Sequence, residues 1–209
     1  MKYIIFIYLF FFSYNSWSTN ISWYDLELRN NLYYDKKNNT PFTGIVNGEK
    51  GGKITNGKKE GEWKEFWSNG VLSSLITYSK GKYHGRYLSY YENGQLNVKV
   101  IYKNNKKEGE FVDYYETGQL NWTENYKNGK VHGLSIIYHE NGNLWYKTNF
   151  EAGERHGEYL KFNIQGKLIE KKIYIKGNID GEWFRYNDVG QLIDKKIYDD
   201  GLLIKTIKP

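Results

Sequence analysis

Residues 85–108 read GRYLSYYENGQLNVKVIYKNNKKE, and this pattern recurs along most of the chain with a period of 24 residues and no insertion or deletion between copies. Each copy opens with a glycine: Gly61, Gly85, Gly109, Gly133, Gly157 and Gly181. With that glycine counted as offset 0, offset 9 is always glycine, offset 11 is always leucine, and offsets 5 and 17 are always aromatic. A constant period of this length is typical of a protein that stacks one structural unit.

The turn residues identify this unit as a β-hairpin. Asn-Gly pairs at offsets 8 and 9, as in Asn93-Gly94, separate two segments of alternating residues. Asn-Gly supplies the positive φ angles of a tight hairpin turn. A second turn at offsets 18 to 23, as in Asn128-Gly129-Lys130, leads to the next opening glycine. We therefore expect successive hairpins that pair in chain order as an antiparallel meander.

Alternation along a strand assigns the repeated side chains to two faces. Offsets 3, 5, 11 and 17 are expected to share the buried face, because they are apolar or aromatic in nearly every unit. Offset 2 points to the opposite face, yet it is aromatic in five of the six units. Both faces of the predicted sheet therefore carry aromatic side chains.

The repeats also define the expected domains. Residues 1–18 are predicted to be a signal peptide, residues 19–60 an N-terminal cap with a degenerate repeat that opens at Gly44, and residues 205–209 a C-terminal tail. The six hairpin units between them are 61–84, 85–108, 109–132, 133–156, 157–180 and 181–204. The predicted fold class is all-β, a single elongated, twisted antiparallel β-meander or solenoid of about six to seven tandem 24-residue β-hairpin repeats.

The first residues have the layout of a secretory signal peptide. Lys2 precedes an apolar run from Tyr3 to Phe12, and a polar stretch follows that ends in Ser16-Trp17-Ser18. Ten apolar residues are too few for a helix that spans a hydrocarbon core of about 30 Å. The sequence therefore predicts export to the periplasm, the cell surface or the medium, with cleavage near Ser18. The alternatives are an uncleaved anchor and a buried N-terminal strand.

The composition excludes several kinds of chemistry. Tyr, Phe and Trp make up 18% of the 209 residues, and a mean hydropathy of −0.76 favours a thin, extended fold over one with a thick core. The chain has no cysteine, which excludes disulfides, thiolate metal sites, thiol nucleophiles and cysteine lipidation. The net charge is +6.

No residues form a pattern that predicts catalysis or metal binding. His84, His132 and His156 all occupy offset 23, where a turn role is expected because neighbouring units lie about 9 to 10 Å apart and no third ligand is evident. Glutamates recur at offset 1, as at Glu110, like a solvated row that faces lysines. A catalytic pair needs one special environment, so a glycan hydrolase built on these glutamates is the weaker alternative. We expect no enzyme activity and no cofactor.

Two surface features are candidates for binding. The first is an aromatic groove on units one to three, formed by offsets 2 and 6, which could hold a peptide strand, a glycan or an acyl chain. The alternative is that a thin sheet needs aromatic cover on both faces. The residues of this groove are Trp63, Trp67, Tyr87, Tyr91, Phe111 and Tyr115.

The second feature is a basic stripe at offsets 14 and 15. Stacked lysines could meet an anionic lipid or a polyanionic glycan, and export disfavours nucleic acid as the partner. The alternative is that these lysines keep exposed strands soluble and discourage edge pairing. The stripe consists of Lys99, Lys147, Lys171, Lys172, Lys195 and Lys196.

The repeated pattern resembles the variant MORN repeat (membrane occupation and recognition nexus), over about residues 26–205. The resemblance rests on Gly85-Arg-Tyr-Leu-Ser-Tyr-Tyr-Glu-Asn-Gly-Gln-Leu96, followed by Tyr102 and Gly109. The segments Arg29-Asn-Asn-Leu-Tyr-Tyr34 and Pro41-Phe-Thr-Gly44 are similar to the entry motif of bacterial proteins with arrays of this repeat. Many such proteins are labelled antitoxins of toxin-antitoxin systems. The resemblance implies a repeat fold and no catalytic motif.

These observations lead to one functional hypothesis and two alternatives. We expect a non-catalytic, exported repeat protein that binds a protein or a cell-envelope component, with contact to a membrane surface allowed. We also expect the chain to be a monomer. The first alternative is an antitoxin-like protein that neutralises a partner toxin, and the second is the envelope glycan hydrolase.

Overall fold

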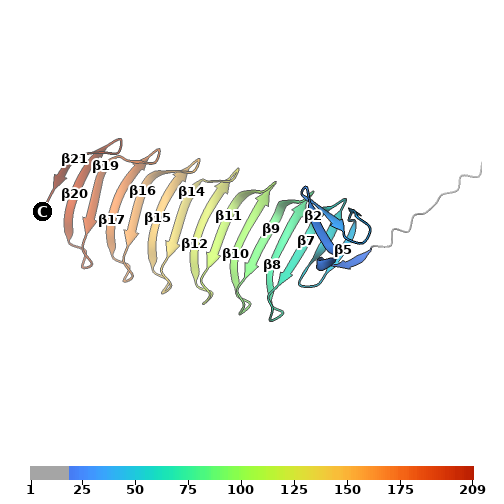
Figure 1. Ribbon diagram of the computed structural model, residues 1–209. Helices are drawn as coiled ribbons and strands as arrows, with labels where there is room; N and C mark the ends of the chain where they lie inside the picture. The colour runs from blue at the N-terminus through green and yellow to red at the C-terminus, as the bar shows by residue number, and fades with distance from the viewer. Residues whose placement is uncertain (1–18) are drawn as a thin grey trace, which may run out of the picture.

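The computed structural model describes residues 19–209, and the predicted signal peptide at residues 1–18 lies outside the described residues. The predicted fold class is confirmed. The chain forms one large sheet of sequential antiparallel hairpin strands that does not close on itself, and a second sheet of three strands (Figure 1). Among residues 19–209, no helix is long and apolar enough to cross a bilayer.

The strands of the large sheet pair in chain order, apart from β1 (Asn20–Ser22), which pairs in parallel with β5 (Gly44–Asn47). From β5 the sheet continues through β6 (Lys50–Thr55), β7 (Lys58–Phe66), β8 (Leu72–Ser79), β9 (Lys82–Tyr90), β10 (Leu96–Lys103), β11 (Lys106–Tyr114) and β12 (Leu120–Lys127). It ends with β13 (Lys130–Val131), β14 (Gly133–Tyr138), β15 (Leu144–Glu151), β16 (Glu154–Phe162), β17 (Leu168–Ile175), β18 (Asn178–Ile179), β19 (Gly181–Tyr186), β20 (Leu192–Asp199) and β21 (Leu202–Ile207).

A β-bulge with a positive-φ glycine interrupts the first strand of each unit. Gly109 has a φ of +73°, and the other five opening glycines also have positive φ. Around Gly109 the pairing shifts, because Val100 pairs with Phe111 whereas the next residue, Ile101, pairs with Glu108. Glycine adopts positive φ without steric cost. Two residues of β11, Gly109 and Glu110, therefore have no partner on β10. Extra residues in one strand bend that strand and increase the local twist, so the opening glycine recurs because it bends the sheet.

The two ends of each hairpin use different turns. Asn104 and Asn105 both have positive φ, as a two-residue type I′ turn requires, and the equivalent positions of the other units repeat this. At the opposite end Gly94 has a φ of +85°, whereas Asn93 does not have positive φ. The expectation that Asn-Gly supplies two positive φ angles there is therefore wrong for asparagine. Its Oδ1 instead accepts a hydrogen bond from the backbone N–H of Gln95 at 2.9 Å.

Strand pairing divides the side chains between two faces. We call the side that carries offsets 2, 4, 13, 15 and 17 the aromatic face, and the side that carries offsets 1, 3, 5, 11 and 14 the leucine face. On β7 and β8, Trp63 pairs with Ile76 on the aromatic face, and Lys64 pairs with Leu75 on the leucine face. The same pairing recurs in later units.

The expectation that offset 17 shares a face with offsets 3, 5 and 11 is wrong. Tyr78, at offset 17, packs edge-to-face against Trp63 with 6.3 Å between ring centroids, and so lies on the aromatic face. The cause is a second bulge. Leu72 pairs with Phe66, whereas Ser74 pairs with Glu65. One extra residue therefore lies between Leu72 and Ser74 and breaks the alternation in the second strand.

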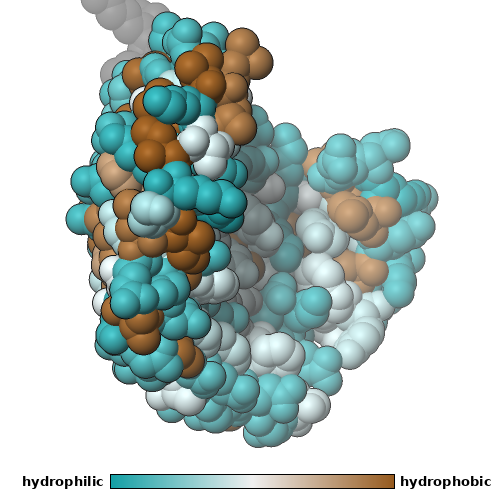
Figure 2. Space-filling view, turned by 90° about the vertical axis from the view of Figure 1, so that its left-hand side faces the viewer, coloured by the Kyte–Doolittle hydropathy of each residue, from teal (hydrophilic) through white to brown (hydrophobic). Residues whose placement is uncertain are grey.

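Most of the buried side chains of the repeats lie on the aromatic face, as expected for the inner side of a curved sheet. Figure 2 looks along the array from its C-terminal end and shows an open hollow lined mainly in white and teal, with brown gathered mainly on the left-hand wall nearest the viewer. Tyrosine and tryptophan have the intermediate hydropathy that is drawn in white. The buried aromatic-face residues include Trp63, Ile76, Val100, Phe111, Glu124, Ser135, Thr148 and Tyr174.

Residues before Gly61 close this hollow at its N-terminal end. A 3-10 turn at Trp23–Asp25 leads into the small sheet of β2 (Leu26–Arg29), β3 (Leu32–Asp35) and β4 (Thr40–Pro41). Trp23 packs edge-to-face on Trp63, with 5.9 Å between ring centroids. The hydrophobic core of the protein is formed here, by Leu26, Phe42, Val46, Ile54 and Trp63.

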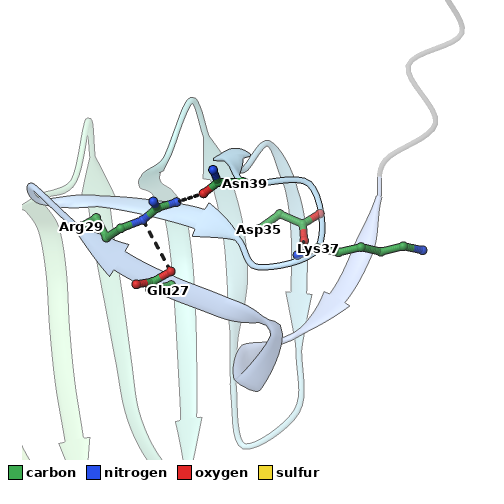
Figure 3. Close-up of polar contacts among 5 residues, drawn as sticks. All are labelled: Glu27, Arg29, Asp35, Lys37 and Asn39. Atoms are coloured by element: carbon green, nitrogen blue, oxygen red, sulfur yellow. Dashed lines mark hydrogen bonds and ion pairs between the residues drawn. The ribbon is translucent and has the colours of Figure 1, made fainter.

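Polar contacts hold the small sheet together (Figure 3). Arg29, at the end of β2, donates a hydrogen bond from Nη2 to Asn39 Oδ1 at 2.5 Å, and its Nε lies 3.5 Å from Glu27 Oε2. Asp35 Oδ1 accepts a hydrogen bond from the backbone N–H of Lys37 at 2.8 Å. The hydrogen bond between Arg29 and Asn39 connects β2 to the loop between β3 and β4.

The backbone requirement at the opening glycine can be tested with Gly109→Ala, since a Cβ at this position would have no atom within 4 Å. The methyl group disfavours positive φ by about 1–2 kcal/mol, so the urea midpoint of unfolding is expected to fall. Gly109→Asn should lose less, because asparagine tolerates this conformation better. Unchanged stability of Gly109→Ala would contradict the bulge.

Candidate functional site

A series of aromatic contacts follows the aromatic face. The ring centroid of Tyr83 lies 5.1 Å from that of Tyr78 and 5.2 Å from that of Tyr102. Phe111 and Trp122 continue the series at 5.0 Å. Tilted and edge-to-face pairs of this kind contribute about 0.5–1.5 kcal/mol each beyond their burial. The rings therefore stabilise the sheet and also line its hollow.

In alternate units a basic side chain two residues before the opening glycine lies over these rings. Lys59 Nζ lies 4.1 Å from the ring centre of Trp63, and Lys107 Nζ lies 4.2 Å from that of Phe111. Arg155 holds the third such position. Burial lowers the pKa of Lys59. These basic residues recur every 48 residues, twice the length of one unit, so the 24-residue pattern does not reveal them.

The aromatic face is polar in the middle of the array. Glu124, Ser135 and Thr148 lie there on strands β12, β14 and β15, and each is at most 3% exposed. Trp122 Nε1 donates a hydrogen bond to Ser135 Oγ at 3.2 Å. Within residues 19–209, Glu124 Oε1 and Thr148 Oγ1 have no hydrogen-bond partner. Burial raises the pKa of the Glu124 carboxyl above its usual range.

Beyond this polar zone the aromatic face is both aromatic and basic. Lys172 Nζ lies 4.6 Å from the ring centre of Tyr159 and 4.7 Å from that of Trp183, and it forms an ion pair with Glu170 at 2.7 Å. Lys196 Nζ lies 4.9 Å from the ring of Trp183. The C-terminal half of the hollow can therefore offer both cations and ring faces to a ligand.

The structure does not bring the six residues of the predicted aromatic groove together. Trp63, Tyr87 and Phe111 lie on the aromatic face, and Trp63 is fully buried under the small sheet. The offset-6 residues lie instead in the turns, where they link neighbouring units. Trp67 Nε1 donates to Tyr90 O at 3.0 Å, Tyr91 OH to Tyr114 O at 2.7 Å, and Tyr115 OH to Tyr138 O at 2.7 Å.

The predicted basic stripe is divided between the two faces. Lys99, Lys147, Lys171 and Lys195 lie on the leucine face, and three of them form ion pairs with offset-1 glutamates: Lys99 with Glu110 at 3.8 Å, Lys171 with Glu158 at 3.0 Å, and Lys195 with Glu182. Lys147 forms no ion pair within residues 19–209, because Glu158 of the neighbouring strand is paired with Lys171. Lys172 and Lys196 lie on the aromatic face, where they contact rings.

The histidines at offset 23 contact different neighbours and do not converge on one site. His84 Nδ1 is 3.3 Å from Asn104 Oδ1, and His156 Nδ1 is 3.7 Å from Glu151 Oε2. In the part of the chain that the structure describes, no group of three or more His, Asp or Glu side chains is placed to hold a metal ion.

Comparison with protein families gives the class of the repeat. The MORN repeat variant matches residues 59–80, 83–104, 107–128 and 131–152. This stretch of the chain belongs to the MORN repeat variant family, and the next two units continue the same strand pairing. No curated protein matches the chain.

The links between units can be tested with Tyr115→Phe, which removes the hydroxyl that donates to Tyr138 O. The lost hydrogen bond is expected to lower the free energy of unfolding by about 1 kcal/mol. Tyr114→Phe is the matched control, since its hydroxyl makes none of the hydrogen bonds that join the units. Urea unfolding of both variants measures the difference, and equal midpoints would show that this bond does not stabilise the array.

The buried carboxyl predicts a pH dependence. Because the pKa of Glu124 is raised in the folded protein, the folded state holds this proton more tightly than the unfolded chain, and the associated stability is lost as the pH rises through the folded-state pKa. Glu124→Gln is therefore expected to raise the melting temperature at pH 7 and to change it little below about pH 4. A lower melting temperature of the variant at pH 7 would mean that attraction to Lys107 outweighs burial.

Proposed function

We propose that this protein is a non-catalytic, exported binding module and that its ligand lies in the hollow of the aromatic face. The observation that supports this most is the lining of that hollow, where rings and cations are repeated along many strands. Flat rings and cations bind ligands by stacking and by charge, and they need no reactive group to do so.

Regularity favours binding over catalysis. A catalytic site needs a few side chains in one special environment. The glutamates at offset 1, which were weighed as acid-base residues, lie on the leucine face, and Glu110 and Glu158 form ion pairs there with lysines. The rings and cations of the aromatic face, in contrast, recur over several units of the described chain.

Export follows from the predicted signal peptide and places the ligand in the cell envelope or outside the cell. Because the chain has no cysteine, an oxidising location would alter no thiol. The antitoxin and glycan-hydrolase alternatives remain predictions, since no contact described above favours either of them.

The proposal is tested by capture from envelope extract on the immobilised chain, with two double variants. Tyr87→Ser with Tyr159→Ser removes rings from the aromatic face, and Tyr90→Ser with Phe162→Ser removes rings from the leucine face of the same strands, β9 and β16. We expect the first variant to lose at least about tenfold of the bound component, because each ring contributes about 1 kcal/mol or more, and the control to retain it.

Both variants must first show cooperative melting and an unchanged sheet signal in circular dichroism. Capture that survives the aromatic-face changes, or that is lost equally in both variants, would contradict the proposal. Turnover of a captured glycan by the wild-type chain would contradict the non-catalytic part.

A further inference from the structure

The strongest unassigned feature is an excess of basic groups at the C-terminal end of the aromatic face. Between Phe150 and Tyr198 the strand positions of this face carry five basic and two acidic side chains, a net charge of +3. These are Arg155, Lys161, Lys172, Arg185 and Lys196 against Glu170 and Asp194. The N-terminal end differs, since the small sheet covers the aromatic face there.

Three of these cations have no carboxylate partner. Lys172 forms its ion pair with Glu170, and Arg185 forms one with Asp194. Arg155, Lys161 and Lys196 form no ion pair within residues 19–209. Arg155 is exposed, and Lys161 and Lys196 are half-buried. A cation held on a concave surface without a partner attracts an anionic ligand more strongly than an exposed pair would.

Ring faces lie between these cations. Tyr159 and Trp183 occupy offset 2 of consecutive units, about 9 to 10 Å apart as alternate strands of a sheet are. Trp183, Lys161 and Arg185 also line a shallow pocket of about 340 Å³ on this face. In the direction across the strands the surface therefore alternates aromatic rings with cations: Tyr159, Lys172, Trp183 and Lys196.

We infer that this end of the aromatic face binds a linear polysaccharide that carries carboxylates. The inference rests on the proposed function and names its ligand class. The C–H groups of sugar rings can pack against the parts of Tyr159 and Trp183 that face the hollow, at a spacing comparable to the length of a disaccharide, while carboxylates of the chain meet Arg155, Lys161 and Lys196. Arginine suits this task because its guanidinium matches a carboxylate in a bidentate arrangement.

The acidic side chains of this face favour a sugar chain over a nucleic acid. Glu170 and Asp194 lie among the cations of the aromatic face. Asp188 lines the shallow pocket beside Trp183. These carboxylates can accept hydrogen bonds from sugar hydroxyls. A nucleic-acid backbone carries a charge at every nucleotide, and its binding sites are much more positive than a face with this balance of charges.

Fluorescence titration with polygalacturonate, using the tryptophans of the full chain, tests the inference. The variant Lys161→Gln with Lys196→Gln removes two unpaired cations from the aromatic face. Its matched control is Lys171→Gln with Lys195→Gln, which makes the same change of net charge on the leucine face. Lys195 is adjacent to Lys196 in the sequence but points to the opposite face. Fully methyl-esterified polygalacturonate is the uncharged probe, and oligo-dT and phosphatidylglycerol vesicles are the competing anions.

We expect polygalacturonate to bind, with affinity that falls as salt rises. The aromatic-face variant should weaken it at least about tenfold, the control should change it less than about threefold, and the esterified chain should bind weakly. Equal losses in the two variants would overturn the inference, because they would indicate a general field effect. Binding of oligo-dT or vesicles in place of polygalacturonate would also overturn it.

The failure of this inference can be told apart from failure of the proposed function. If polygalacturonate does not bind but envelope capture still depends on Tyr87 and Tyr159, the ligand class is wrong and the hollow remains the binding surface. If neither depends on the aromatic face, both proposals fail.

Discussion

The positive-φ glycine that opens each unit is the constraint on which the rest of the structure depends. At Gly109 and its equivalents, two extra residues in the first strand bend the sheet in the same sense along the array. The type I′ turn at the other end of the hairpin fixes the length of the connection. Because no unit gains or loses a residue, these bends add along the array instead of cancelling, and one face becomes the inner side of a hollow.

Curvature explains why the two faces differ in chemistry. Side chains on the inner side are crowded, so that large rings meet across strands and cations lie over them, with Lys59 buried and Lys107 half-buried. The outer side is spread apart, and there lysines and glutamates pair at positions such as Lys171 and Glu158. Exposed pairs of this kind contribute about 0–1 kcal/mol, so the inner face supplies most of the stability and also the surface that we propose for binding.

The sequence was sufficient for the fold but not for the assignment of faces. A fixed period with a glycine before each strand and another in each turn predicts hairpins in chain order, because few other structures need positive φ at both places. Alternation failed between Leu72 and Tyr78, since a bulge adds a residue that no repeat alignment reveals. The same kind of error grouped Lys171 with Lys172, although adjacent residues of a strand point to opposite faces. The predicted groove included Trp67, but this side chain lies in a turn and donates a hydrogen bond to the next unit. That contact depends on turn geometry, which the alternation of residues does not reveal.

The most direct test of this account uses two adjacent residues that follow an opening glycine. Leu134 is 39% exposed on the leucine face, and Ser135 is 3% exposed on the aromatic face. The chain has no cysteine, so Leu134→Cys and Ser135→Cys each give a protein with a single thiol, whose rate of labelling by a maleimide can be measured under native conditions. The account predicts rapid labelling at position 134 and labelling at least about a hundredfold slower at position 135, since the latter needs local opening. Equal rates, or faster labelling at position 135, would contradict the inward orientation of the aromatic face.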